Sequence, residues 1–383
     1  MAPARRNLFL TFAVFALEPM PFGAWLALIP EVKTALGLSK ADLALALLGM
    51  PMGVFLMLQW SGRLVSRIGP RRLLAIALPV QALLVFLPLL AGSLVQLWAG
   101  LFLLGMCIAV LQVGLNVYAG RLEKARGAAI MNRCHGFWAL GVTIGSFFVA
   151  VMAGVSAFWI VALIGLPSAA LGIWVALSLD RLAEDDTGPI PPRRNWRAIP
   201  PRLGLIAICA LAASMTEGAM ADWAAVYLAE RLPSDADHAG VAVTIFAAFL
   251  AGGRFVGDAA RERLGIVRLT RAALVCALAG LACLILPLPL FTSYFGFALI
   301  GLGVSVGFPL GVSAAAELDD QYEGQNIAIL SMVTMGGFLV GPPLIGGLAE
   351  LFGLRIGLAA LIPMTLAGLI LARNMAPPSR VAG

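Results

Sequence analysis

The chain has 383 residues, of which 61% are hydrophobic and only 12% are charged, and its formal net charge is +6. Two stretches without Asp, Glu, Lys or Arg, residues 134–179 and 272–316, are each about twice the roughly 20 residues that span a bilayer once. Such stretches exclude a water-soluble globular protein, whose helices would need polar faces.

Twelve apolar segments follow one another along the chain, and each is predicted to be a membrane-spanning helix, because a backbone in hydrocarbon must satisfy its own hydrogen bonds. In chain order the predicted helices are 7–30, 41–62, 73–91, 95–118, 134–153, 156–179, 203–229, 239–258, 270–288, 292–316, 326–348 and 354–374. The polar segment 180–202 contains five prolines and separates six helices from six. We therefore predict an all-α integral membrane protein with six-helix bundles at 1–179 and 203–383, joined by a cytoplasmic linker.

The two halves carry similar short sequences in the same order, which indicates that one six-helix unit occurs twice. The matched positions are Gly62-Arg63-Leu64-Val65 with Gly253-Arg254-Phe255-Val256, Leu104-Gly105 with Ile300-Gly301, and Trp25 with Trp223. Two parallel repeats in a membrane typically move against each other around a central site. We expect two bundles related by a pseudo-twofold axis, with a solute site between them.

Basic residues fall almost entirely in every second gap between the predicted helices. With the N-terminus inside, the inner segments hold 22 of the 26 Lys and Arg residues, and the outer loops hold the other four. This distribution follows the positive-inside rule, so both termini are expected in the cytoplasm. The positive net charge is therefore explained by orientation and indicates no nucleic-acid partner.

Sequence motifs for catalysis or cofactor binding are missing. The five cysteines have no metal-ligand spacing, and there is neither a nucleotide-binding loop nor a hydrolytic triad. An ATP-driven pump would need a soluble motor domain, and no segment is long enough to form one. We expect no metal, no cofactor and no enzymatic activity.

The segment between the second and third predicted helices, Gly62-Arg63-Leu64-Val65-Ser66-Arg67-Ile68-Gly69-Pro70-Arg71-Arg72, resembles the G-x-L-x-D-R-x-G-R-R signature of the major facilitator superfamily. Ser66 stands where that family usually has Asp. The resemblance implies a conformational latch at Gly62, Arg63, Arg67 and Gly69, which the missing carboxylate weakens. In the second half, Arg254 and Asp258 are four residues apart, share a helix face and can form a corresponding pair.

More narrowly, the chain is similar to a bacterial branch related to fucose permeases. The similar stretches are Ile29-Pro30-Glu31-Val32-Lys33-Thr34-Ala35-Leu36-Gly37-Leu38-Ser39, Glu217-Gly218-Ala219-Met220-Ala221-Asp222-Trp223 and Gly341-Pro342-Pro343-Leu344-Ile345-Gly346. Drug antiporters of the superfamily usually show Gly-Pro in the fifth helix, where this chain has Gly145-Ser146. That departure favours uptake over efflux.

Three titratable residues within the predicted helices are candidates for proton coupling, because an ionised group in a bilayer should face a cavity or a partner. Glu18 lies in the first helix between Leu17 and Pro19, where prolines should break the helix. The fucose-permease resemblance implies that a carboxylate of the first helix serves proton coupling. Glu217 in the seventh helix and His135 near the inner end of the fifth are the other candidates. The alternative for each is a structural role, as a paired or solvated side chain.

Six further residues are candidates for solute binding. Gln112 and Asn116 are four apart on the fourth helix and share a face, so they can hydrogen-bond a solute or a neighbouring helix. Asp222 is predicted near the outer mouth, five residues from Glu217 and therefore on a different helix face. The aromatic candidates for stacking on a sugar or aromatic solute are Trp25, Trp138 and Trp223, although Trp25 also suits an interfacial anchor.

We therefore expect a monomeric secondary transporter in a bacterial cytoplasmic membrane. It would move a small organic solute, such as a sugar or a derivative, by alternating access and proton symport, with protons and membrane lipids as its other partners. The alternatives are proton-driven efflux of an amphiphilic compound, a membrane sensor without turnover, and a lipid flippase.

Overall fold

The computed structural model describes residues 3–128, 130–182, 199–233, 238–318 and 322–376, and within these ranges every regular element is helical. The helices of the first half are α1 (Pro3–Leu17), α2 (Met20–Ala35), α3 (Lys40–Leu47), α4 (Gly49–Ile68), α5 (Pro70–Leu84), α6 (Phe86–Leu89), α7 (Leu94–Arg126), α8 (Met131–Val151) and α9 (Ala157–Ser178). Those of the second half are α10 (Pro201–Arg231), α11 (Val241–Leu264), α12 (Ile266–Ile285), α13 (Phe291–Val304), α14 (Gly307–Ala316), α15 (Glu323–Phe352), α16 (Leu354–Ala359), α17 (Leu361–Leu371) and the 3₁₀ helix η4 (Ala372–Met375).

Within the described ranges, these helices make 12 segments long and apolar enough to cross a membrane. The prediction of twelve membrane-spanning helices is thereby confirmed. One predicted helix, 95–118, is longer in the structure, because α7 continues to Arg126. The added residues are mostly good helix formers, and the helix ends only at Gly127, whose φ of +61° favours glycine. Most of the linker predicted at 180–202 lies outside the described residues.

The first membrane-spanning segment is broken where the prolines predicted a break. α1 ends at Leu17 and α2 begins at Met20. Pro19 and Pro21 have no N–H group, so the carbonyls of Phe15 and Leu17 lose the donors that an unbroken helix would supply. The break places Glu18 at the end of a helix deep inside the bundle, where its side chain is only 2% exposed.

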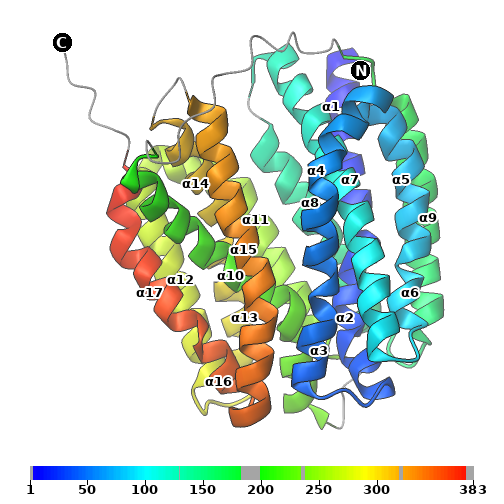
Figure 1. The fold of residues 1–383 in the computed structure, drawn as a ribbon, viewed down its shortest axis with the longest axis vertical. Helices are drawn as coiled ribbons and strands as arrows, with labels where there is room; N and C mark the ends of the chain where they lie inside the picture. The colour runs from blue at the N-terminus through cyan, green and yellow to red at the C-terminus, as the bar shows by residue number, and fades with distance from the viewer. Residues whose placement is uncertain (1–2, 129, 183–198, 234–237, 319–321, 377–383) are drawn as a thin grey trace.

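The spans form two six-helix bundles that lie side by side, one from the first half of the chain and one from the second (Figure 1). In the first bundle α7 packs on α4 and α5, and in the second α13 packs on α11 and α12. The equivalence extends to single glycines: a Cβ on Gly105 would lie 2.2 Å from the carbonyl oxygen of Met50 on α4, and one on Gly301 would lie 2.3 Å from that of Phe246 on α11. The predicted match of Leu104-Gly105 with Ile300-Gly301 therefore corresponds to equivalent helix contacts.

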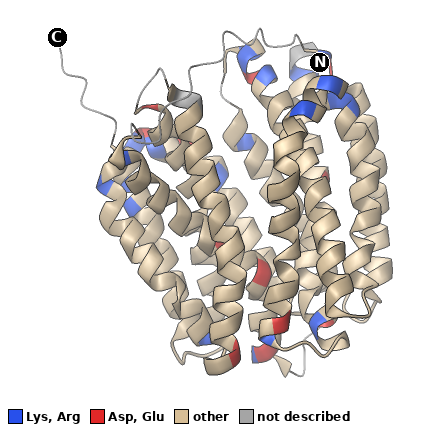
Figure 2. Cartoon of the chain, viewed as in Figure 1, with Lys and Arg blue, Asp and Glu red and all other residues tan. Residues whose placement is uncertain are grey.

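The start of α1 and the end of α17 lie at the same end of the molecule, and most Lys and Arg residues gather there (Figures 1 and 2). We call this the basic end, and we call the opposite end, which includes Leu36–Ser39, the far end. Large apolar side chains cover the outer surface, among them Phe147, Leu163 and Leu351. A surface of this kind suits contact with lipid tails rather than water.

Candidate functional site

Glu18 is held by two neutral donors within the first bundle. Gln81 on α5 donates from Nε2 to Glu18 Oε1 at 3.0 Å, and Trp138 on α8 donates from Nε1 to Glu18 Oε2 at 2.9 Å. No cationic side chain in the described part of the chain pairs with this carboxylate. A buried carboxylate without a counter-charge is costly when ionised, so the site suits a group that gains and loses a proton.

Trp138 connects Glu18 to a less buried part of the bundle. Its side chain is half-buried, and its ring centroid lies 6.2 Å from that of Phe22 on α2. The indole N–H is committed to Glu18, so the ring faces remain for packing against a neighbour. A change in the protonation of Glu18 would therefore act directly on the position of Trp138.

Glu217 belongs to a second cluster, which spans both bundles. Arg254 on α11 donates from Nη2 to Glu217 Oε1 at 2.9 Å, and the two side chains are only 10% and 19% exposed, respectively. Arg254 also donates from Nη1 to the carbonyl oxygen of His135 on α8, at 3.4 Å. One guanidinium group thus contacts the Glu217 carboxylate of the second bundle and the backbone carbonyl group of His135 in the first.

The predicted ion pair between Arg254 and Asp258 is wrong. Arg254 pairs with Glu217, whereas Asp258 accepts a hydrogen bond from the side-chain amide of Asn132 on α8. The reason is that α10 supplies a carboxylate nearer to the guanidinium, while Asp258 lies one turn closer to the basic end and faces the first bundle. The Asn132–Asp258 contact joins the two bundles and is compatible with a latch.

The ends of α4 and α11 correct the register of the predicted repeat. Gly69, with φ of +81°, ends α4, and Gly265, with φ of +73°, ends α11. Arg63 lies six residues before Gly69, but Arg254 lies eleven residues before Gly265. The predicted equivalence of Gly62-Arg63 and Gly253-Arg254 therefore does not fit the helix ends, and Arg254 lies deeper in the membrane than Arg63.

Among the described residues, no hydrogen bond or ion pair joins the first-half latch residues to the second bundle in this conformation. Arg63 and Arg67 are exposed and pair with no described carboxylate, and Gly62 is also exposed. By the register of the helix ends, Ser66 corresponds to Glu262, so the acidic residue that the first half lacks is present in the second. Gly69 has a positive φ that permits the sharp turn from α4 into α5.

Asp222, also on α10, is half-buried and forms no hydrogen bond or ion pair with any described residue. The neighbouring Trp223 is completely buried, and so is Trp25 apart from 1% of its surface. Neither indole N–H has a partner in the described ranges. In this conformation Asp222 is the accessible member of the three, while both tryptophans belong to the packed interior.

Gln112 and Asn116 lie on one face of α7, as their spacing predicted, and both side chains are half-buried. Neither side-chain amide bonds to another described residue, and the Oδ1 atom of Asn116 is buried without a partner. Helix-to-helix hydrogen bonding, the structural alternative for these residues, is therefore not what holds them in this conformation. Their amide groups therefore have hydrogen-bonding capacity that the described residues do not use.

The two bundles meet at the far end through polar contacts. Lys40 at the start of α3 forms an ion pair with Glu230 of α10, with Nζ 3.1 Å from Oε1. Glu350 of α15 accepts hydrogen bonds from the backbone N–H groups of Lys40 and Ala41, at 2.8 and 3.4 Å. Further in, the hydroxyl group of Thr244 on α11 donates to Ser146 Oγ on α8 at 3.0 Å. These contacts close the far end between the halves.

Several partners in these clusters were not singled out from the sequence. Gln81 lies within a predicted helix that has no charged residue. A buried polar side chain in such a helix needs a hydrogen-bond partner, and this requirement could have marked Gln81 as a candidate from the sequence. The pairing of Arg254 with Glu217 could not be read from spacing, because the two residues are on different helices. In the described ranges, no group of three or more His, Cys, Asp or Glu residues could hold a metal ion.

Comparison with known proteins identifies the kind of molecule to which these clusters belong. A sequence model of the Major Facilitator Superfamily matches residues 8–318 and, in a second match, residues 207–382. An uncharacterised MFS-type transporter of Yersinia pestis is 27% identical over 367 residues, covering 93% of each chain. Membrane protein MosC of Rhizobium meliloti is 27% identical over 355 residues, covering 91% of this chain and 85% of the relative.

Solved structures of transporters have the same fold. A variant of the nucleoside transporter NupG superposes with a TM-score of 0.76 at 13% identity, covering 97% of this chain and 98% of the other. A bacterial homologue of the human lysosomal transporter Spinster, in an inward-facing and occupied conformation, gives 0.71 at 16% identity, covering 98% and 97%. At such low identity these likenesses establish the fold alone.

Proposed function

The chain belongs to the Major Facilitator Superfamily and is a multi-pass membrane transporter rather than an enzyme, and we propose that it imports a small polar solute together with protons by alternating access. The observation that carries the coupling proposal is Glu18, a buried carboxylate held by two neutral donors and by no cation. The proposed solute class is a sugar or a derivative.

Orientation follows from the distribution of charge. The basic end is proposed to face the cytoplasm of a bacterial cell, with both termini inside, because positive residues are retained on that side of the membrane. The far end then faces outward and is closed by Lys40, Glu230 and Glu350. Opening these contacts would admit the solute from outside in the other half of the cycle.

The solute is proposed to lie between the bundles, where α7, α8, α10 and α11 carry half-buried polar groups. Gln112 and Asn116 offer amides without partners, and Trp138 offers a ring face. Amides that hydrogen-bond hydroxyl groups, together with an indole that covers an apolar ring face, suit a polyhydroxylated ring such as a sugar. Because the Glu217–Arg254 pair is internally neutral, it does not demand a charged solute.

Proton coupling is proposed to run through Glu18, with Glu217 and His135 as the second group. Protonation of Glu18 removes a buried charge and weakens the hold on Trp138, which adjoins the proposed solute position. At the second group, Arg254 contacts the Glu217 carboxylate on one bundle and the backbone carbonyl group of His135 on the other, and the His135 imidazole does not bond to Arg254 in this conformation. A proton on Glu217 would weaken the ion pair and loosen the contact between the bundles.

Asp222 favours a second candidate function, the efflux of an amphiphilic cation. Its carboxylate has no partner among the described residues and is half-buried, which is an environment that attracts a cation. The absence of Gly-Pro from the fifth membrane-spanning segment argues for import instead. Asp222 therefore supports efflux only if the bound compound is positively charged.

A two-stage experiment tests the proposal. Purified protein is screened by thermal unfolding at pH 5.5 and 7.5 against sugars, nucleosides, amino acids, peptides and cationic drugs, because a ligand that binds the folded state raises the melting temperature. A radiolabelled hit is then offered to proteoliposomes with an imposed pH gradient. Accumulation driven by an acidic exterior supports proton symport. Proton-driven export of an amphiphilic cation, with no sugar binding, would replace the proposal with efflux.

A further inference from the structure

A cavity of about 300 Å³ lies at the basic end of the first bundle, away from the proposed transport site. Four arginines line it, Arg71, Arg72, Arg121 and Arg181, and none of the lining residues among those that the structure describes is acidic. They come from the start of α5, from the basic end of α7 and from the chain just after α9. Four like charges around one cavity repel one another unless an anion occupies it.

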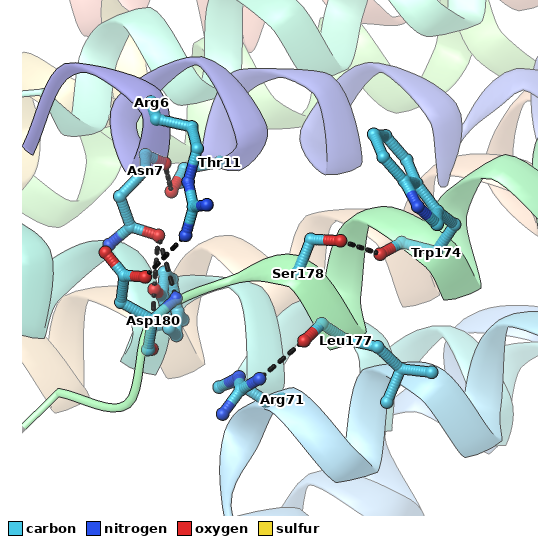
Figure 3. A network of polar contacts seen from close by, with 9 residues as sticks. Arg6, Asn7, Thr11, Arg71, Trp174, Leu177, Ser178 and Asp180 are labelled. Atoms are coloured by element: carbon cyan, nitrogen blue, oxygen red, sulfur yellow. Dashed lines mark hydrogen bonds and ion pairs between the residues drawn. The ribbon is translucent and has the colours of Figure 1, made fainter. Parts of the chain in front are cut away.

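A network of hydrogen bonds fixes one wall of this cavity (Figure 3). The Tyr118 hydroxyl group lies 2.9 Å from Asn7 Oδ1 and 3.0 Å from the Asp180 carbonyl oxygen. The nearby carboxylate of Asp180 is already paired, because Arg6 donates to its Oδ1 at 2.9 Å. Arg71 is oriented by donating from Nη2 to the carbonyl oxygen of Leu177. These hydrogen bonds hold the wall of the cavity in place. Because the Asp180 carboxylate is paired with Arg6, it does not neutralise the positive charge of the four arginines in the cavity.

Two further observations show that donors in the cavity lack acceptors. The Nε atoms of Arg71 and Arg121 are buried and have no hydrogen-bond partner in the described residues. The cavity also contains the start of α5, a 15-residue helix whose N-cap, Gly69, provides no side-chain acceptor. The first-turn N–H groups of a helix have no intrahelical acceptor and carry partial positive charge, which is a common way to bind a phosphate.

We propose that this cavity binds a phosphate group, carried either by an anionic phospholipid or by a soluble phosphorylated anion. Guanidinium groups bind phosphate oxygens through short, charge-assisted hydrogen bonds, and the fork of Arg can bind two oxygens at once. Arg121 and Arg72 supply the free guanidinium groups, while Arg71 and Tyr118 form the fixed wall. The site is separate from Glu18 and from the Glu217–Arg254 pair.

The position of the cavity favours the lipid as the source of the phosphate. Trp159 and Trp174 on α9 are 61% and 62% exposed, and exposed tryptophans mark the two membrane interfaces. They are fifteen residues apart in the sequence, or roughly 22 Å at 1.5 Å per residue, which spans most of the roughly 30 Å of the hydrocarbon layer. Leu177, whose carbonyl group holds Arg71, lies one turn beyond Trp174 (Figure 3). The cavity is thus level with the lipid headgroups.

Native mass spectrometry of the full-length, delipidated protein tests this site. The protein is incubated with phosphatidylglycerol or with phosphatidylethanolamine at equal concentration, and the retained lipid is counted. Phosphatidylglycerol should be retained in preference, and the double substitution Arg72→Gln/Arg121→Gln should weaken its retention by at least about tenfold, the loss expected for charge-assisted hydrogen bonds. A separate arm compares inorganic phosphate with chloride at equal ionic strength by thermal unfolding, with and without the double substitution.

A matched control is Arg268→Gln. Arg268 is exposed and is the third residue of α12, as Arg72 is of α5, and a positive-φ glycine precedes each helix. It is not among the residues that line the cavity of the first bundle, so its loss should leave lipid retention unchanged. An unchanged size-exclusion profile of the double variant shows that the fold is intact, and Arg72→Lys/Arg121→Lys should restore part of the retention.

The outcomes separate the two sources. If lipid retention depends on Arg72 and Arg121 and inorganic phosphate has no effect on unfolding, the site binds the lipid headgroup. If stabilisation by inorganic phosphate depends on these two arginines and lipid retention does not, the site binds a soluble anion. Equal lipid retention by the wild-type protein, the double variant and Arg268→Gln, together with no phosphate response that depends on Arg72 and Arg121, would overturn the proposal.

Discussion

The indole nitrogen of Trp138 lies 2.9 Å from Oε2 of Glu18, so a half-buried aromatic ring on α8 is tied to a carboxylate buried at the break between α1 and α2. The break between α1 and α2 allows the Glu18 side chain to reach Gln81 and Trp138 instead of continuing a regular helix.

Glu18→Gln should abolish proton-driven accumulation while leaving solute exchange intact. Glutamine preserves an acceptor for the Trp138 N–H but cannot bind or release a proton, so only the coupled step is lost. The measurement is uptake into proteoliposomes with and without a pH gradient, beside counterflow without one. Gln81→Leu is the matched control, because it removes a hydrogen bond to Glu18 without removing the titratable group. Normal gradient-driven accumulation by Glu18→Gln would make this carboxylate a structural residue.

Breaking the Glu217–Arg254 pair should destabilise the fold more than breaking an exposed pair on the same helix. Arg254→Met leaves the Glu217 carboxylate without its partner, with an expected coupling in a double-mutant cycle of about 1–3 kcal/mol. The check is thermal unfolding in detergent of both single variants and the double variant. Each single substitution, Arg254→Met or Glu217→Gln, should lower the melting temperature, and the double variant should lower it by less than the sum of the two single decreases.

The control for this cycle is the ion pair between Arg261 and Glu317, which is 3.0 Å long and whose side chains are 36% and 41% exposed. Exposed pairs contribute at most about 1 kcal/mol, so the Arg261→Met and Glu317→Gln substitutions should change the melting temperature little. Equal coupling energies in the two cycles would contradict the special role given to Glu217 and Arg254 between the bundles.

Two adjacent glycines on α15 provide a test of closure at the far end. A Cβ on Gly346 would lie 2.3 Å from the Cβ of Ala44 and 2.9 Å from the carbonyl oxygen of Lys40, whereas a Cβ on Gly347 would have no atom within 4 Å. Gly346→Ala should therefore push α3 from α15, impair closure and lower the transport rate, while Gly347→Ala should transport like the wild type. The check is the initial uptake rate of both variants at equal expression, and equal rates would show that the far end does not need this close contact.

The twelve helices were predictable because their apolar length is a property of the sequence itself. The break at Glu18 was also predictable, since Pro19 and Pro21 lack the N–H groups that a continuous helix requires. The spacing of Gln112 and Asn116 correctly placed both on one face of α7. Features of this kind depend on residues near one another in the chain, and periodicity or a missing donor is enough to reveal them.

The clusters were harder to predict because their members come from different helices. Spacing paired Arg254 with Asp258, but it could not show that α10 brings Glu217 to within 2.9 Å of the same guanidinium. In the same way, Trp25 and Trp223 suited solute stacking by residue type, yet packing buries both almost completely in this conformation. Which carboxylate a guanidinium meets, and which indole stays accessible, are decided by helix packing.

Gln112→Leu should weaken solute binding without destabilising the protein. The side-chain amide of Gln112 bonds to no described residue, so the folded state loses no hydrogen bond when it is replaced, and leucine favours the helix as much as glutamine does. A hydrogen bond to an uncharged solute contributes about 0.5–1.5 kcal/mol, so the dissociation constant should rise by up to about tenfold. The unfolding temperature without ligand and the ligand-induced increase measure the two effects on one sample.

The control variant Gln81→Leu should show the opposite pattern, with lower stability and a smaller effect on binding, since Gln81 bonds to Glu18. If Gln112→Leu lowers stability as Gln81→Leu does, Gln112 packs between helices in solution and does not face the solute.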